Sequence, residues 1–166
     1  MTGGLRIEKL KRGHPVDAFG SGEPALDRFL VKHALQSQQA GASTTYVALV
    51  GSDIVGFYSL AFGQVEYDGA PERLTKGLAR HPVPVILLAR LAVASDRHGQ
   101  GLGAGLLKGA MLRTLQAADI AGLRAILVHA KGERARAFYT HFGFVPSPTD
   151  PLHLMLLIKD VRSAAG

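Results

Sequence analysis

The sequence predicts a mixed α/β domain in which helices cover the faces of a β-sheet. Three observations predict it: short runs rich in Val, Ile and Leu, longer segments with apolar residues at helical spacing, and the alternation of the two along the chain. The expected order, β-α-β-β-β-α-β-α-β, describes a mixed sheet with helices on its faces. Because the 166 residues contain no repeat or linker, we expect one domain over residues 1–166.

The first half of the chain predicts one strand, one helix and a hairpin. Leu5–Leu10 alternates apolar and polar residues, as a short strand does. Glu23–Ala40 begins with Glu-Pro, continues with apolar residues at helical spacing, and ends at Gly41, so it predicts a helix. Thr44–Val50 and Ile54–Val65 follow as strands, and the Gly-Ser-Asp run between them is a typical hairpin turn.

The second half predicts three more strands and two more helices. A connection over Asp68–Pro82, with one short helix in it, leads to a nearly continuous apolar run that suits a strand buried on both faces. The strands are expected at Val83–Ala94, Arg124–His129 and Leu152–Ile158, and the helices at Gly101–Ala118 and Glu133–Phe142, the last ended by Gly143.

Composition narrows the function classes. The net charge of +6 and the isoelectric point of 9.9 favour a nucleic acid or a nucleotide-like ligand over a charge that serves solubility alone. The chain has no cysteine, which excludes disulfides and thiolate metal sites and is compatible with the cytoplasm. The seven histidines show no paired spacing, so we expect no metal. Met1–Leu10 lacks the apolar stretch of a signal peptide, and Val83–Ala89 is too short to span a membrane.

A glycine-rich turn follows the buried strand and opens the next helix. Its residues are Arg97, His98, Gly99, Gln100, Gly101, Leu102, Gly103 and Ala104. Glycines let backbone N–H groups approach a ligand closely, and a helix N-terminus adds free donors and the positive end of a dipole. The turn therefore predicts a diphosphate site, with a flexible strand–helix connection as the alternative.

Two other phosphate-binding motifs fit this turn poorly. A P-loop ends in Gly-Lys-Ser or Gly-Lys-Thr, and neither run follows these glycines. A Rossmann fingerprint requires Gly-x-Gly-x-x-Gly, whereas these glycines recur at every second position. The spacing therefore disfavours both of these nucleotide-binding classes.

The strand and the turn together resemble a known family. Leu91-Ala92-Val93 followed by His98-x-x-Gly101-x-Gly103 resembles the coenzyme A site of the GNAT N-acetyltransferases, which usually have Gln or Arg in place of His98. The resemblance implies a GNAT fold with a splayed strand pair, whose backbone binds the pantetheine arm while the turn grips the diphosphate. His98 can still donate to a phosphate, and Arg97 can supply charge. The implied residues that bind acetyl-CoA are Leu91, Ala92, Val93, Arg97, His98, Gly99, Gln100, Gly101, Leu102, Gly103, Ala104 and Phe138.

The segment Glu133–Phe144 carries the second part of the resemblance. Tyr139, followed by Gly143-Phe144, matches the general acid of the family, whereas Gly132 stands where many members have Asn. A phenol with a pKa near ~10 stays protonated at neutral pH and can donate to a thiolate that leaves with a pKa near ~8.5. The alternative is that Tyr139 only packs against neighbouring aromatic residues.

Further segments resemble a narrower group, the GNAT toxins of type II toxin–antitoxin modules. These segments are 19–27, 38–46, 83–85, 88–93 and 151–155. The resemblance implies acetylation of the α-amino group on charged tRNA, which blocks translation, together with a homodimer and a ribbon-helix-helix antitoxin. The alternatives are a GNAT enzyme for a small amine or a protein N-terminus, and a binding module without catalysis.

A tRNA substrate requires basic residues for its phosphates. The candidates are Lys32, Arg73, Lys76, Arg80 and Arg90. Arg90 is favoured because it interrupts an apolar strand, and its alternative is an ion pair with a nearby carboxylate. No motif marks a general base; Glu66, Asp68, His129 and His141 are possible, although an α-amine with a pKa near ~8 is partly neutral at pH 7.

Overall fold

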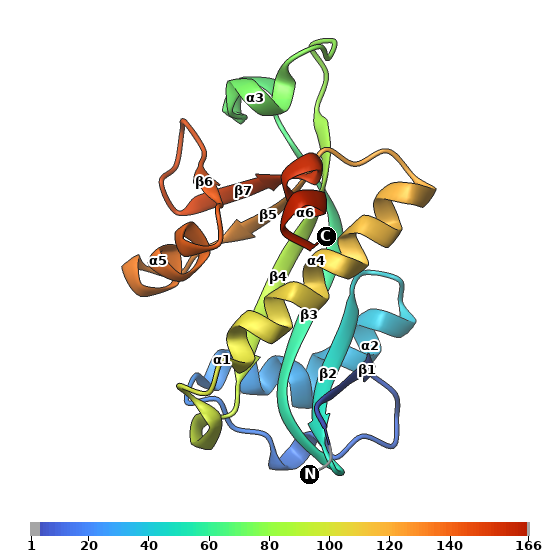
Figure 1. Ribbon diagram of the computed structural model, residues 1–166. Coiled ribbons are helices and arrows are strands. Elements are labelled where there is room, and N and C mark those ends of the chain that lie inside the picture. The colour runs from blue at the N-terminus through green and yellow to red at the C-terminus, as the bar shows by residue number, and fades with distance from the viewer. Residues whose placement is uncertain (1–3, 166) are drawn as a thin grey trace. The chain divides into compact units, whose positions relative to one another are not determined.

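The computed structural model describes residues 4–165 and shows a mixed sheet with helices (Figure 1). The strands are β1 (Arg6–Lys9), β2 (Thr44–Val50), β3 (Asp53–Val65), β4 (Val83–Val93), β5 (Ala125–His129), β6 (Val145–Pro146) and β7 (His153–Leu157), in the sheet order β1-β2-β3-β4-β5-β7-β6. β4 and β5 are parallel, whereas β1–β2, β2–β3, β5–β7 and β6–β7 are antiparallel. The predicted fold class is confirmed.

In chain order the helices lie between these strands, except α6, which follows β7. They are α1 (Pro24–Arg28), the π-helix η2 (Phe29–His33), α2 (Ala34–Gln39), α3 (Glu72–Thr75), α4 (Leu102–Ile120), α5 (Glu133–His141) and α6 (Ile158–Ala165), with short 3-10 turns η1 (Val16–Ala18), η3 (Tyr67–Gly69) and η4 (Ser95–Arg97).

The chain divides into two compact units, each made of two sequence segments. One unit comprises Met1–Ala61 and Ala89–Ala110, and the other comprises Phe62–Leu88 and Met111–Gly166. The elements β3, β4 and α4 each begin in one unit and end in the other. The expectation of a single domain stays a prediction, and its limits at residues 1 and 166 lie outside the described residues, as does the start of the segment Met1–Leu10.

In the first unit, α1, η2 and α2 supply one side of an apolar core. Leu30 and Ala34 are buried with Val47 of β2. The ring of Phe57 on β3 lies between two others, 5.6 Å from Phe19 and 6.4 Å from Phe29. The single helix predicted over residues 23–40 is wrong in one respect, because a π-helix interrupts it. Over five residues the π and α periods give nearly the same apolar pattern, so the sequence does not distinguish them.

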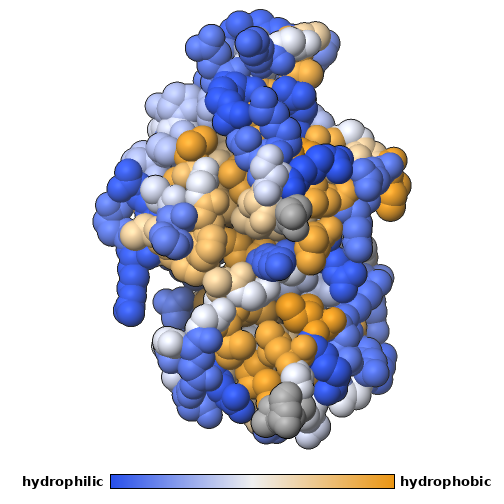
Figure 2. Space-filling model, in the orientation of Figure 1, coloured by the Kyte–Doolittle hydropathy of each residue, from blue (hydrophilic) through white to orange (hydrophobic). Residues whose placement is uncertain are grey.

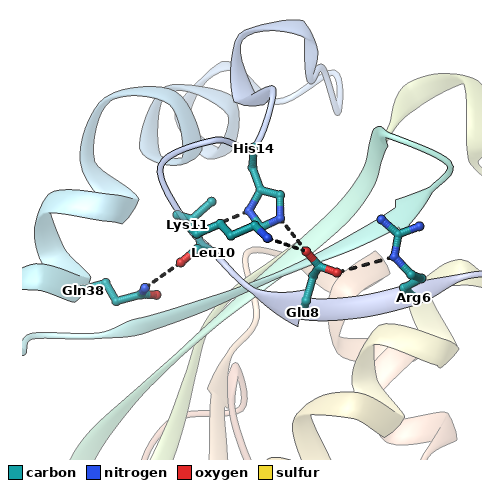
Figure 3. Close-up of polar contacts among 6 residues, drawn as sticks. All are labelled: Arg6, Glu8, Leu10, Lys11, His14 and Gln38. Carbon is teal, nitrogen blue, oxygen red and sulfur yellow. Dashed lines mark hydrogen bonds and ion pairs between the residues drawn. The ribbon is translucent and has the colours of Figure 1, made fainter.

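A polar cluster fixes the loop between β1 and η1 (Figure 3). The backbone N–H of Lys11 donates to Nδ1 of His14, so Nε2 of His14 carries the proton that it donates to Glu8, at 2.8 Å. The His14 side chain is only 6% exposed, and this hydrogen bond is the main reason that the pKa of Glu8 is lowered. Gln38 joins the loop to α2 and β2, since its amide donates to Leu10 O and accepts from Thr45 N–H.

Helix α4 packs closely on the sheet within the first unit. Leu106 and Leu107 are buried, and the helix approaches β3 at a glycine. A Cβ on Gly56 would lie 2.8 Å from Leu106 Cδ1 and 2.9 Å from the carbonyl oxygen of Ala92. The absence of a side chain at Gly56 therefore sets the position of α4 against the sheet.

In the second unit, β5 lies between the first half of β4 and β7, and β7 is followed by β6 (Figure 1). Its core includes Leu74 and Val85, and Arg124 donates to the carbonyl oxygen of Leu74 at 3.1 Å. The sequence analysis missed β6, which is only two residues long, and α6. The predicted strand Leu152–Ile158 ends at Leu157, because α6 begins at Ile158.

The surface carries few large apolar side chains. Among the described residues they are Leu5, Phe62, Leu112, Ile120 and Val145, of which Ile120 is the most exposed, at 87%. Figure 2 shows hydrophilic and hydrophobic residues together on the viewed face. Exposed apolar residues are normal for a folded surface.

We expect Gly56→Ala to destabilise the protein by about 1–3 kcal/mol, because the new methyl group meets a backbone oxygen that cannot move aside. Denaturant unfolding measures the change. Gly63→Ala on the same strand is the matched control, since its Cβ would meet Val85 Cγ2 at an ordinary 3.6 Å. Equal stability of the two variants would contradict this account of the helix–sheet contact.

Candidate active site

β4 continues in the sequence beyond the residues that pair with β5. Within the second unit, Val85–Leu88 pairs with Ala125–Val128. β5 ends at His129, directly after that pair, whereas β4 continues to Val93. Leu91 and Val93 are half-buried and Ala92 is buried. This is the part of β4 for which the resemblance implies a splayed strand with backbone groups available to a ligand, and that role stays a prediction.

Two residues of the glycine-rich turn have a left-handed backbone. Gly99 and Gly101 have φ angles of +80° and +78°, in the left-handed region that favours glycine. α4 begins directly afterwards, and the hydrogen bond from Gly105 N–H to Gly101 O, at 3.2 Å, belongs to its first turn. The N–H groups before Gly105 lie at the positive end of this long helix, where they suit an anion. Gly103, by contrast, is an ordinary residue within the helix.

His98 has a hydrogen-bond partner within the protein. Its Nε2 lies 2.9 Å from the carbonyl oxygen of Val93, so the side chain folds back onto β4. The side chain of Arg97, at the end of η4, forms no hydrogen bond or ion pair with any described residue. A charge for an anionic ligand is therefore available at Arg97, whereas His98 already has a protein partner.

A cavity of about 380 Å³ has Arg97 in its lining. The other residues that line it all precede Arg97 in the sequence, so none of the glycines of the turn is among them. Its lining includes Phe19, Ile54 and two carboxylates, Asp53 and Asp96. Carboxylates repel phosphate, so this cavity is a poor diphosphate site compared with the N-terminus of α4.

Tyr139 lies on α5 in the second unit and is 7% exposed. Its ring makes edge contacts with Phe138 and Phe144, with ring centres 5.1 and 5.4 Å apart. Burial raises the pKa of Tyr139 to about 12, so the phenol is protonated throughout the physiological range. No residue in the described part of the chain forms a hydrogen bond with its hydroxyl. The ring of Tyr139 therefore packs against its aromatic neighbours while its hydroxyl group stays available as a hydrogen-bond donor.

The sequence offers four possible general bases, and the structure shows specific side-chain contacts for two of them, Asp68 and His129. Asp68 forms an ion pair with Arg80. His129 stacks on His153 with ring centres 4.0 Å apart, and its pKa is lowered first by burial and then by the charge of His153. A lowered pKa keeps His129 neutral at pH 7, which a base requires. Nothing in the structure distinguishes Glu66 or His141 as a base.

The five basic candidates also separate into two groups. Arg73 donates to Asp160 at 2.9 Å, and Arg80 pairs with Asp68. Arg90 instead has its guanidinium 3.6 Å from the centre of the Phe29 ring, and burial lowers its pKa. The ion pair considered as an alternative for Arg90 is absent among the described residues.

Lys32 in η2 and Lys76 after α3 are exposed, and the structure shows no partner for the ammonium group of either within residues 4–165. These two lysines and Arg90 are thus the candidates whose charge no carboxylate neutralises. Over the same residues there is no His, Asp and Glu group that could hold a metal, and no helix long and apolar enough to cross a membrane.

Comparison with known proteins identifies the family. The model of the acetyltransferase (GNAT) domain matches residues 41–146. The chain is 50% identical to a tRNA-acetylating toxin of Mycobacterium tuberculosis, over 100% of this chain and 99% of that protein. It also matches AtaT complexed with acetyl-methionyl-tRNAfMet, with a TM-score of 0.90 and 26% identity over 96% of this chain and 98% of that one.

A second structure of AtaT adds two ligands. It is a tyrosine-to-phenylalanine mutant of the toxin, bound to the C-terminus of the antitoxin AtaR and acetyl-CoA. It matches with a TM-score of 0.82 and 26% identity, over 96% of this chain and 97% of that one. The chain therefore belongs to the GNAT acetyltransferase family, in the part of it that holds the tRNA-acetylating toxins. The family resemblance seen in the motifs is confirmed.

Two glycine substitutions test the backbone of the turn. Gly101→Ala forces a side chain into the left-handed region and should cost about 1–2 kcal/mol. Gly105→Ala lies in α4 with open space around its Cβ and should instead stabilise the helix by about 1 kcal/mol. The free energy of unfolding and the affinity for coenzyme A are measured for both variants. We expect Gly101→Ala to weaken coenzyme A binding and Gly105→Ala to leave it unchanged. Unaltered stability and binding in Gly101→Ala would contradict the described turn.

Proposed function

We propose that this protein transfers the acetyl group of acetyl-CoA to the α-amino group of the amino acid on charged tRNA, and that it acts as the toxin of a type II toxin–antitoxin module. The family membership supports acetyl transfer. The observation that carries the proposal is the free hydroxyl of the buried Tyr139, because the family chemistry needs a neutral donor there. The acceptor is proposed from the 50% identical tRNA-acetylating toxin and from the AtaT complex with acetyl-methionyl-tRNAfMet.

The donor set fits acetyl-CoA. The left-handed glycines and the α4 N-terminus offer N–H groups to a diphosphate, and Arg97 adds a positive charge. Leu91 and Val93 offer backbone groups to the amides of the pantetheine arm, and Phe138 offers an apolar ring. The residues present thus match the anionic, amide and apolar parts of the molecule in turn. When bound, acetyl-CoA supplies a thioester whose carbonyl carbon accepts the attacking amine.

Tyr139 stabilises the leaving sulfur. The amine nitrogen forms a bond to the thioester carbonyl carbon, the carbon–sulfur bond breaks, and the electron pair moves to sulfur. A thiol has a pKa near ~8.5, well below the value of about 12 for this buried phenol, so Tyr139 donates a hydrogen bond rather than giving up its proton for good. The proton that ends on sulfur comes from the nitrogen, which must lose one as the amide forms.

The acceptor needs little help from a base. An α-amino group has a pKa near ~8, so on the order of a tenth is neutral and nucleophilic at pH 7. His129 is the candidate whose environment favours the neutral form, and we propose it only as an assisting base. A lysine side chain, with a pKa near ~10.4, would be almost fully protonated, which favours an aminoacyl acceptor over a lysine.

The tRNA phosphates require cations that are not already paired. Arg90, Lys32 and Lys76 meet this condition, and we propose that they bind tRNA; Arg73 and Arg80 contribute less, because carboxylates neutralise them. The ring of Phe29 holds the guanidinium of Arg90 in a fixed orientation, which lowers the entropy lost when it binds a phosphate.

The proposed partners have two sources. We propose an antitoxin, supported by the structure of AtaT with the C-terminus of AtaR. From the sequence we further propose that this antitoxin is of the ribbon-helix-helix class and that the chain forms a homodimer in the cytoplasm. An acetyltransferase for a small amine or a protein N-terminus is the second candidate function, and it would need neither the antitoxin nor the unpaired basic residues.

Tyr139→Phe tests the function and the mechanism together. Expression of the wild-type chain should stop growth and leave acetylated aminoacyl-tRNA in the cell. Tyr139→Phe should remove at least about 99% of the turnover, because the leaving sulfur loses its hydrogen-bond donor. Acetyl-CoA binding should stay nearly intact, because nothing else in the side chain changes. Mass spectrometry of the aminoacyl group and calorimetry of acetyl-CoA binding measure these effects.

Tyr67→Phe is the matched control, since this tyrosine contacts Arg80 through its ring, which phenylalanine keeps. It should be as toxic as the wild type. Harmless wild-type expression with unmodified charged tRNA would reject the toxin function. Full activity of Tyr139→Phe would reject the role of the phenol.

Arg90→Ala should weaken tRNA binding and lower its dependence on salt by about one released counterion, because one phosphate contact is removed. Arg90→Lys keeps the charge but not the planar contact with Phe29, so it should restore the salt dependence only. Arg80→Ala is the control whose charge is already paired. The measurement is the tRNA binding constant over a series of salt concentrations. If its logarithm fell with the same slope against the logarithm of salt concentration in the wild type and in Arg90→Ala, Arg90 would not bind phosphate.

A further inference from the structure

The side chain of His98 cross-links the glycine-rich turn to the end of β4. A carbonyl oxygen only accepts hydrogen bonds, so the imidazole donates from Nε2 to Val93 O, at 2.9 Å. This bond also fixes the tautomer, because the proton must be on Nε2. Val93 is the last residue of β4, and His98 immediately precedes Gly99, the first left-handed glycine of the turn.

The backbone between these two residues is already held by other bonds. Ala94 N–H donates to Val55 O at 2.9 Å, and Ser95 N–H donates to Gly20 O at 2.8 Å. Arg97 N–H closes η4 by donating to Ala94 O. The chain is therefore anchored up to Arg97, and the glycines that follow have the greatest conformational freedom of any residues.

His98 stands at the boundary between the anchored chain and the free glycines. From 98 to 101, within the described residues, its imidazole provides the side-chain hydrogen bond that ties this part of the turn to the strand. Without it, Gly99 and Gly101 would sample more conformations, and ordering them on ligand binding would cost more entropy.

We propose that His98 is a positioning residue: it holds the turn that receives the diphosphate in a fixed place relative to the strand end that receives the pantetheine arm. This inference rests on the proposed acetyl-CoA site, and it differs from a direct contact between the imidazole and a phosphate. A direct contact acts only when the cofactor is present, whereas a cross-link acts in the free protein.

The two roles are separated by measuring the free protein as well as the complex. Hydrogen exchange of the amides at 99–105 reports the mobility of the turn without ligand, and calorimetry reports coenzyme A binding. We expect His98→Ala to speed that exchange and to weaken binding about tenfold, the loss of one hydrogen bond. His98→Gln should restore both, because the amide nitrogen of Gln reaches as far as Nε2. His81→Ala, an exposed histidine in the connection before β4, is the control and should change neither.

Each other outcome overturns the inference. Weaker binding with unchanged exchange in His98→Ala would show a direct phosphate contact. Faster exchange with unchanged binding would show a bond that does not serve the cofactor, and no change in either would show that the bond has no role. If the wild-type protein failed to bind coenzyme A, the proposed function would fail, while the exchange data would still show whether His98 holds the turn.

Discussion

The proposed chemistry depends on the backbone N–H groups where the glycine-rich turn enters α4. In the proposed site a diphosphate would be bound by backbone geometry rather than by a particular side chain, because Gly99 and Gly101 adopt left-handed conformations that other residues avoid. The surrounding structure keeps these groups in place. Gly56 lets α4 lie close to the sheet, and η4 is bonded to Val55 and Gly20 at its start. Substitutions at any of these positions should therefore weaken cofactor binding more than acceptor binding.

Burial gives Tyr139 the properties that the proposed reaction needs. A buried phenol with no hydrogen-bond partner stays neutral and keeps its donor available, and the neighbouring rings of Phe138 and Phe144 fix its orientation. The same burial would be costly for a charged acid. An acceptor with a low pKa complements this arrangement, because it reduces the need for a strong base beside the thioester.

Much of the fold could be predicted from local patterns. The strand β2 begins and ends at the predicted residues, and α4 and α5 lie close to their predicted bounds, because apolar periodicity and glycine stops are local signals. The strand β6 could not be predicted, since two residues carry no period. The start of α6 was missed because Ile158 continues the apolar run of β7. The π-helix within the first helical segment was missed because its period differs too little from that of an α-helix over five residues.

In the candidate site, too, some features have a local signal in the sequence and others have none. The glycines and Tyr139 could be proposed from the sequence because their chemistry depends on residue type and spacing. Contacts between residues distant in sequence were not found. The ring under Arg90 belongs to Phe29, and the partner of Arg73 is Asp160, so neither pairing has a signal in a single sequence. The bond from His98 to Val93 is nearer in sequence, but it depends on how η4 bends the chain.

A crystal structure of the protein with coenzyme A tests the central claim most directly. The account predicts diphosphate oxygens within hydrogen-bonding distance of the N–H groups of residues 99–104, and the cofactor sulfur within reach of the Tyr139 hydroxyl. A diphosphate bound elsewhere, for example in the cavity lined by Asp53 and Asp96, would contradict it. A Tyr139 hydroxyl directed away from the sulfur would contradict it equally.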